Sequence, residues 1–180
     1  MEAVKENKDY LLHYTREVTG EVIEKTVNAR ELFRRIAETN WDYAEPGALF
    51  WDRITGWNLL SNTEDFAYAG VNPCAEEPLP AGGSCLLGSV NLAEFVQNPF
   101  TDTAFFDFDS FKKCVQASVN ALNEVLEEGL PLHPLEEQRK SVEKWRQIGL
   151  GIMGLADALI KLGITYGEAE AVEVCDKIGF

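Results

Sequence analysis

Three residue types that can perform acid–base and sulfur chemistry alternate in one short stretch of the chain. Asn72, Cys74 and Glu76 stand two residues apart, in a segment rich in proline. Prolines favour an extended backbone, in which side chains two positions apart point to the same side. The pattern therefore predicts one face with a hydrogen-bonding amide, a reactive sulfur and a proton acceptor. A structural loop that happens to contain a cysteine is the alternative that the residues alone leave open.

The other three cysteines divide into two kinds. Cys114 and Cys175 fall on the apolar stripes of predicted helices, where cysteine packs as a small hydrophobic residue. Cys85, like Cys74, belongs to no regular stripe and lies in the loop-rich middle of the chain. Four cysteines in 180 residues are too few for a disulfide scaffold. We therefore expect core roles for the two helix cysteines and treat Cys85 as a second candidate thiol.

The sequence predicts neither a metal site nor a nucleotide-binding turn. The two histidines, His13 and His133, form no pair with the spacing of a zinc site, and the cysteines form none either. Residues 149–154 match the G-x-G-x-x-G pattern, which binds dinucleotides only when a buried strand precedes it and a helix follows. Residues 141–147 are charged and amphipathic. A structural role in close strand–helix packing is the better interpretation of these glycines.

The elements that must position these residues follow from hydrophobic periodicity. Residues 10–15 and 21–27 favour strands with a Thr19-Gly20 turn between them, and a helix from Ala29 should stop before Pro46. Further helices are predicted from an N-cap at Asp109 to Gly129, and then over three ranges. Those ranges are about 135–145, 155–162 and 168–178. The chain thus divides into a hairpin and helix (1–45), a loop-rich segment (46–108) and a helical part (109–180), a helix-rich α/β arrangement.

Composition excludes several classes of protein. The chain is 46% hydrophobic and 11% aromatic, which argues against a disordered tail. A net charge of −14 argues against a generic binder of the nucleic-acid backbone. No stretch approaches the roughly 20 apolar residues of a membrane span, and the charged N-terminus is not a signal peptide. We expect a cytoplasmic protein that forms one domain or a piece of a larger one.

Residues 72–76 and 83–92 together resemble the finger-loop segment of the catalytic subunit of ribonucleotide reductases. Residues 19–33, 46–50 and 148–157 also match stretches of that family, in the family's order. The resemblance implies a partial fragment of a ten-stranded α/β barrel, in which a loop threads the centre and carries the key cysteine at its tip. Residues 1–180 would then be an internal part of the catalytic barrel domain.

The resemblance also implies a role for each candidate residue. Cys74 would be the thiyl radical that takes the 3′ hydrogen from the ribose of a ribonucleoside di- or triphosphate. Glu76 would accept the proton of the 3′-hydroxyl, and Asn72 would hydrogen-bond the substrate. Cys85 would be one of two thiols that deliver the reducing electrons as they close to a disulfide. The product would be a deoxyribonucleotide for DNA synthesis.

The resemblance also bears on the source of the radical. The spacing of eleven from Cys74 to Cys85, and the residues between them, most resemble the adenosylcobalamin-dependent class. A metal-radical class with a separate small subunit is the alternative, and no cofactor-binding residue is assigned. A thioredoxin-type reductant and a homo-oligomeric state are further implications.

The match covers only part of the family's pattern. Family chains are much longer, so the partner thiol, the effector region and the phosphate loop would lie outside this chain. We therefore expect a fragment that is inactive alone.

Two other functions remain open. A glycyl-radical-type barrel enzyme is one alternative, although its C-terminal glycine motif is absent here. A non-catalytic helical interaction module is the other.

Overall fold

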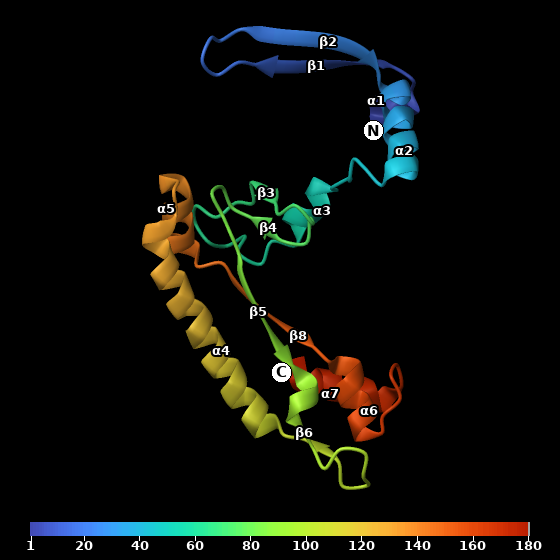
Figure 1. Cartoon of the computed structure of the whole chain (residues 1–180). Coiled ribbons are helices and arrows are strands. Elements are labelled where there is room, and N and C mark those ends of the chain that lie inside the picture. The colour runs from blue at the N-terminus through green and yellow to red at the C-terminus, as the bar shows by residue number, and fades with distance from the viewer. Residues whose placement is uncertain (180) are drawn as a thin grey trace. The chain divides into compact units, whose positions relative to one another are not determined.

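The computed structural model describes residues 1–179, which divide into two compact units (Figure 1). The first unit is Met1–Arg53, and the second begins at Ile54. A short helix, α3 (Trp51–Gly56), spans the boundary in the chain. Strands in the described residues pair two by two, in four separate sheets. No helix in this part of the chain has the length and apolar character needed to cross a membrane.

The first unit opens with a short helix and a β-hairpin. Helix α1 (Glu2–Lys5) precedes β1 (Asp9–Thr15), which pairs antiparallel with β2 (Val22–Asn28). Gly20 turns the chain between the strands with a φ of 70°, a conformation that costs glycine little because it has no Cβ. The predicted hairpin is confirmed.

Helix α2 (Ala29–Tyr43) follows the hairpin directly. The side-chain oxygen of Asn28 accepts a hydrogen bond from the Glu31 N–H at 3.0 Å, which satisfies a free donor of the first turn. Ala44 ends the helix in the left-handed region with a φ of 59°, two residues before the proline. The predicted start at Ala29 and the predicted stop before Pro46 are both confirmed.

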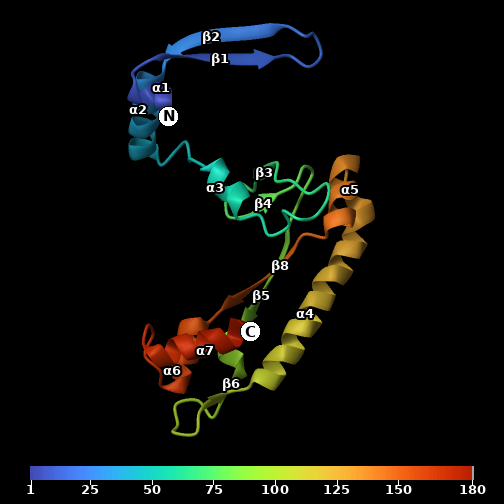
Figure 2. The same ribbon diagram turned by 180° about the vertical axis from the view of Figure 1, so that it is seen from behind.

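The second unit is organised around one parallel pair of strands, β5 (Leu86–Asn91) and β8 (Ile148–Met153). Helices α4 (Phe108–Gly129) and α5 (Glu136–Trp145) lie between them in the chain, with a 3-10 turn, η2 (Leu130–Leu132), joining the two helices. A parallel pair needs such a crossover because both strands start at the same end. Helix α4 contacts both strands, and it can be followed from both sides in Figures 1 and 2. Strand β5 lies within the segment 46–108 that was expected to be rich in loops.

The two faces of this strand pair are built differently. On one face, a Cβ added to Gly88 would lie 3.5 Å from Leu122 of α4, in ordinary packing contact. On the other face, a Cβ added to Gly149 would press on Leu87 at 2.7 Å and lie 3.6 Å from the sulfur of Cys85. Gly149 and Gly151 therefore lie in a strand, and Gly149 leaves room for a side chain of the neighbouring strand β5 and not for a helix.

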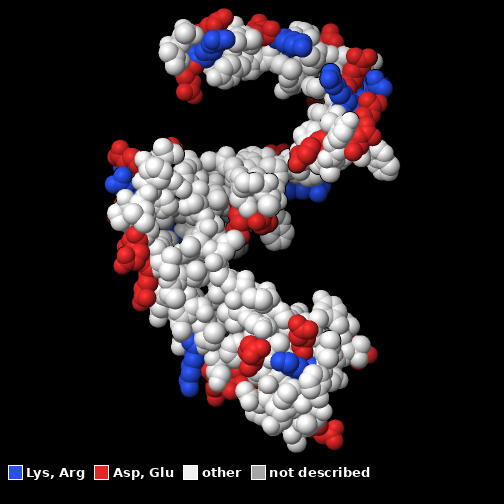
Figure 3. Space-filling view, viewed as in Figure 1, with Lys and Arg blue, Asp and Glu red and all other residues white. Residues whose placement is uncertain are grey.

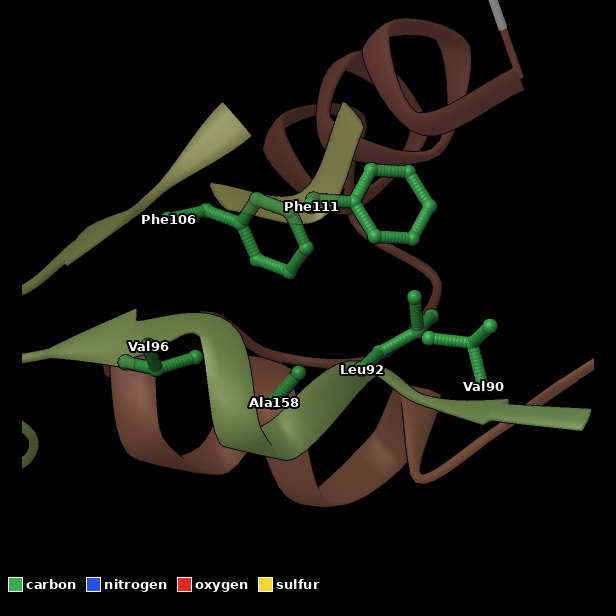
Figure 4. Packing of buried hydrophobic residues seen from close by; sticks show 6 residues of the cluster. All are labelled: Val90, Leu92, Val96, Phe106, Phe111 and Ala158. Carbon is green, nitrogen blue, oxygen red and sulfur yellow. The ribbon is translucent and has the colours of Figure 1, made fainter. Parts of the chain in front are cut away.

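Phenylalanine and aliphatic side chains from residues 90–111, together with Ala158, form the core cluster of the second unit. A 3-10 turn, η1 (Leu92–Phe95), leads from β5 into β6 (Val96–Gln97), which pairs with β7 (Phe105–Phe106). The buried cluster consists of Val90, Leu92, Val96, Phe106, Phe111 and Ala158. Figure 4 shows the two phenylalanine rings above η1, with Ala158 of α6 (Leu155–Leu162) beneath it. The ring centroids are 5.6 Å apart in an edge-to-face arrangement.

Most helix boundaries agree with the predictions, and two details do not. Helix α6 is confirmed, while α5 and α7 (Ala169–Gly179) begin within one residue of their expected starts. The N-cap of α4 is Asp107 rather than Asp109, because both carboxylate oxygens of Asp107 accept hydrogen bonds from Ser110. Cys114 packs against the core cluster as expected. Cys175 is exposed, so its predicted core role is wrong.

Candidate active site

Asn72, Cys74 and Glu76 lie in one loop, residues 72–77, between β3 (Gly70–Val71) and β4 (Pro78–Leu79). Two hydrogen bonds close the base of this loop. The Asn72 N–H donates to the Glu77 carbonyl at 3.2 Å, and the Asn72 side-chain oxygen accepts from the Glu77 N–H at 2.9 Å. The amide that was expected to face a substrate thus uses its oxygen to hold the loop together.

The tip of this loop is a tight turn and not the extended backbone that was predicted. The Ala75 N–H donates to the Asn72 carbonyl at 2.9 Å, with Pro73 at the second position of the turn, where its fixed φ fits. Ala75 then takes a φ of 69°. The side-chain alternation of a strand does not apply to such a backbone. Cys74 occupies the third position of the turn, and its side chain is exposed, as is that of Glu76.

A second turn returns the chain from β4 towards β5. The Gly83 N–H donates to the Pro80 carbonyl at 2.9 Å, and Gly82 takes a φ of 67° at the third position. Glycine is favoured there because this turn type requires a positive φ. A Cβ on Gly82 would also lie 2.8 Å from the Glu137 carbonyl oxygen, so the turn packs closely on α5. The turn delivers Cys85 to the start of the parallel strand pair.

Cys85 is half-buried, directly before β5. The next residue anchors it, because the Leu86 N–H donates to the Gln147 carbonyl at 3.0 Å. Burial raises the pKa of the Cys85 thiol, and the negative charge of Glu77 raises it further. Both effects disfavour the thiolate, so Cys85 holds its proton at neutral pH. A protonated thiol is the form that can give up hydrogen and electrons.

Gln147 and Ser141 also belong to this site, in addition to the four residues predicted from the sequence. The Gln147 side-chain nitrogen donates to the Ser141 hydroxyl at 3.4 Å and lies 3.1 Å from the position of a Cβ on Gly83. Ser141 is buried, and the side-chain oxygen of Gln147 is buried without a hydrogen-bond partner in residues 1–179. A polar side chain directly before a glycine-rich strand was the available signal.

The site residues form two groups along the chain. Asn72, Cys74 and Glu76 share the first loop. Cys85 lies beyond the second turn, and the charge of Glu77 contributes to the raised pKa of its thiol. Within the described residues no hydrogen bond joins the side chains of Cys74, Glu76 and Cys85, and all four cysteines are free thiols. Figure 3 shows acidic side chains near β4 and along α4 and α5, with a largely uncharged surface between them.

Comparison with known proteins identifies the family. Residues 3–179 match the family described as "Ribonucleotide reductase, barrel domain". The vitamin B12-dependent ribonucleoside-diphosphate reductase of Thermoplasma acidophilum is 38% identical over 156 residues, which is 87% of this chain and 19% of that protein. The protein of the same name from Mycobacterium tuberculosis is 32% identical over 89% of this chain and 22% of its own length.

A relative with a different name matches a similar stretch. The ribonucleoside-diphosphate reductase subunit alpha of Chlamydia pneumoniae is 31% identical over 91% of this chain and 15% of its own length. This chain therefore spans about a fifth, or less, of the length of these relatives. The described residues, with their mixture of helices and paired strands, correspond to a partial α/β fragment. Because the family match covers residues 3–179, the chain belongs to the ribonucleotide reductase family, within its barrel domain.

Proposed function

We propose that this chain supplies the finger loop and one reducing thiol of an enzyme that converts ribonucleotides to deoxyribonucleotides. The observation that carries the proposal is an exposed Cys74 at the tip of a hydrogen-bonded loop, followed by a half-buried, protonated Cys85. In the net reaction, a ribonucleotide and two thiols give a deoxyribonucleotide, a disulfide and water. The two thiols supply both electrons and both hydrogens.

The four residues divide this reaction among them. Cys74 as a thiyl radical removes the 3′ hydrogen, and Glu76 accepts the proton of the 3′-hydroxyl. Asn72 donates a hydrogen bond to the substrate through its side-chain nitrogen, because its oxygen is already bonded to the Glu77 N–H. Cys85 and a second thiol from elsewhere in the polypeptide close to a disulfide.

Adenosylcobalamin is the cofactor that this proposal favours, since the relatives from Thermoplasma and Mycobacterium are named as vitamin B12-dependent. When bound, it supplies the radical through its cobalt–carbon bond. The exposed position of Cys74 suits this group, because a sulfur that reacts with so large a cofactor must be open to it. A separate radical-generating subunit is the second candidate, and the Chlamydia relative named subunit alpha favours it.

The remaining partners follow from the reaction. The substrate is a ribonucleoside di- or triphosphate, and a thioredoxin-type protein reduces the disulfide after each cycle. We place the enzyme in the cytoplasm as a homo-oligomer. The chain alone is proposed to be inactive, because the second thiol and the phosphate-binding residues are not among its own.

The test replaces Cys74 with serine in the complete reductase polypeptide that contains this chain. Serine differs by one atom and cannot form the radical under these conditions, so we expect nucleotide reduction to fall below detection while the circular dichroism spectrum is unchanged. Cys175→Ser is the matched control, because that thiol is also exposed, and it should retain activity. Turnover that survives in C74S overturns the radical assignment. Assays with and without adenosylcobalamin decide between the two radical sources.

A further inference from the structure

Aromatic side chains connect the chain before the finger loop (residues 72–77) to the end of helix α5. The Phe66 ring packs edge-to-face on the Trp145 ring, with the two ring centroids 4.9 Å apart. The Tyr68 ring packs edge-to-face on Phe66 in turn, at 5.5 Å, and all three side chains are half-buried. An aromatic contact of this geometry stabilises a structure beyond the apolar area that it buries. None of the three residues has a role in the proposed reaction so far.

Charged groups lie around the same aromatic contact. The Lys144 ammonium lies over the Trp145 ring, 4.5 Å from its centroid, and 3.7 Å from a carboxylate oxygen of Asp65. Asp65 directly precedes Phe66 in the chain. The two side chains of this ion pair are 53% and 78% exposed, so the pair is weak. The aromatic rings therefore provide most of the contact.

The other end of the finger loop packs on the same helix. A Cβ on Gly82 would lie 2.8 Å from the Glu137 carbonyl oxygen, so backbone meets backbone there. Glu137 lies in the first turn of α5, and Trp145 is its last residue. Eight residues of helix span about 12 Å. The segment 65–83 thus rests on α5 at two separate points, which fix its direction as well as its place (Figures 1 and 2).

Hydrogen-bonded backbone connects the aromatic contact to the reactive thiol. The Ala69 N–H, three residues after Phe66, donates to the Leu79 carbonyl at 2.8 Å. Strand β3 follows directly and pairs with β4, and this pairing leads to the turn that holds Cys74. A shift of Phe66 on Trp145 should therefore move Cys74 with it, because little free loop lies between them.

We propose that Trp145 is a positioning residue for Cys74, and that it acts through its contact with Phe66. The inference rests on the proposed role of Cys74 as the thiol that carries the radical. Hydrogen abstraction depends steeply on the distance and alignment of the reacting atoms, and a misplacement of about 1 Å can lower a rate by about a hundredfold. Trp145 takes no part in the chemistry and determines where the thiol stands when it reacts.

The experiment is a double-mutant cycle of Trp145→Ala and Phe66→Ala in the complete reductase polypeptide. Hydrogen exchange followed by mass spectrometry measures the hydrogen-bonded amides of residues 72–77. We expect each single variant to accelerate their exchange by about two- to tenfold, because one aromatic contact is lost. The double variant should exchange no faster than the faster single variant, since both changes remove the same contact. Trp145→Phe keeps an aromatic ring and should restore most of the wild-type protection.

Turnover provides the second measurement. We expect Trp145→Ala to lower kcat by at least about fivefold, because the thiol is misplaced. The KM for the nucleotide should change by less than about twofold, since the phosphate-binding residues are proposed to lie outside this chain. Trp145→Phe should recover most of kcat. Trp57→Ala is the matched control and should change neither measurement, because Trp57 is an 82% exposed tryptophan of the same unit.

Exchange of the α4 amides is the folding control in the same samples. If these amides also exchange faster in W145A, that variant is unfolded and Phe66→Ala decides, because Phe66 lies outside the core cluster. Wild-type protection of the loop in F66A overturns the inference, as do single effects that add in the double variant or an unchanged kcat in W145A with a loosened loop. Turnover that survives in Cys74→Ser would overturn the role of Cys74 without altering the exchange result.

Discussion

Asn72 forms hydrogen bonds within its own loop. Its side-chain oxygen and its backbone N–H both bond to Glu77, so the residue closes the loop that presents Cys74. A side chain that closes the loop carrying Cys74 links the stability of the loop to the placement of the thiol. Substitutions here should therefore affect structure and activity together, and the choice of replacement can separate the two.

We expect Asn72→Ala to destabilise the loop, because the half-buried Glu77 N–H loses its acceptor at a cost of about 1 kcal/mol. Asn72→Asp keeps an acceptor oxygen in place and should hold the loop, while it loses the nitrogen proposed to face the substrate. Hydrogen exchange at the Glu77 amide measures the loop directly. Fast exchange in N72A with slow exchange in N72D is the expected result. Equal protection in N72A and wild type would contradict the closing role.

At the scale of elements, the start of α4 depends on one carboxylate. The backbone N–H of Ser110 and then its hydroxyl hold the pKa of Asp107 below its ordinary value. Because the pKa of Asp107 is lowered in the folded state, the ionised cap stabilises α4 at pH values above the ordinary Asp pKa of about 3.9. This stabilisation is lost as the pH falls through the pKa that Asp107 has in the folded protein. Acid should therefore weaken the helix that connects the two parallel strands.

We expect the melting temperature of wild type to fall more steeply between about pH 5 and pH 3 than that of Asp107→Asn. Asparagine caps a helix about as well as aspartate does but carries no charge to lose. Thermal unfolding followed by circular dichroism at several pH values gives both slopes. Asp109→Asn, in the first turn but not at the cap, is the control and should follow wild type. Parallel slopes for wild type and D107N would refute the assignment of the cap.

Elements with a local cause were predictable from the sequence, and elements with a distant partner were not. Helix α6 ends at Gly163, which takes a φ of 76°, so its stop signal lies within the helix's own neighbourhood. Strand β5 contains a glycine, a serine and an asparagine, and it is a strand because β8 pairs with it. The sequence of residues 86–91 does not by itself indicate that pairing.

The candidate site follows the same division. The residue types at positions 72, 74, 76 and 85 could be chosen from the sequence, together with their chemistry. Their geometry could not, because Pro73 fits both an extended segment and the second position of a turn. The bond from the Asn72 oxygen to the Glu77 N–H closes that turn. Gln147 could not be assigned to the site from the sequence, because it joins the site only through the pairing of β8 with β5.

At the scale of the whole molecule, large apolar side chains remain exposed in both units. Trp41 in the first unit is 89% exposed, and Leu59 and Trp57 in the second are 92% and 82% exposed. Each sheet in the described residues has only two strands, so the outer edges of those strands have no neighbour. Exposed apolar side chains and open strand edges both favour association.

We therefore expect the 180-residue chain to self-associate in a concentration-dependent way. Size-exclusion chromatography with light scattering should give an apparent mass that rises with protein concentration. Tyr14→Lys, on the exposed hairpin, should reduce the association, since a lysine on an edge strand opposes pairing. A mass of 20.1 kDa at every concentration would show that these surfaces do not associate.

The hydrogen bond from the Leu86 N–H to the Gln147 carbonyl affects the order in which the protein acquires its structure. The surroundings of Cys85 come partly from a strand that is made much later in synthesis. At about 5–20 residues per second, the ribosome needs roughly 3–12 s to add the intervening 60 or so residues. During that interval the nascent chain carries a Cys85 that β8 does not yet cover. Its reactivity should fall only when β8 emerges, so oxidants and chaperones meet this thiol in its least protected state.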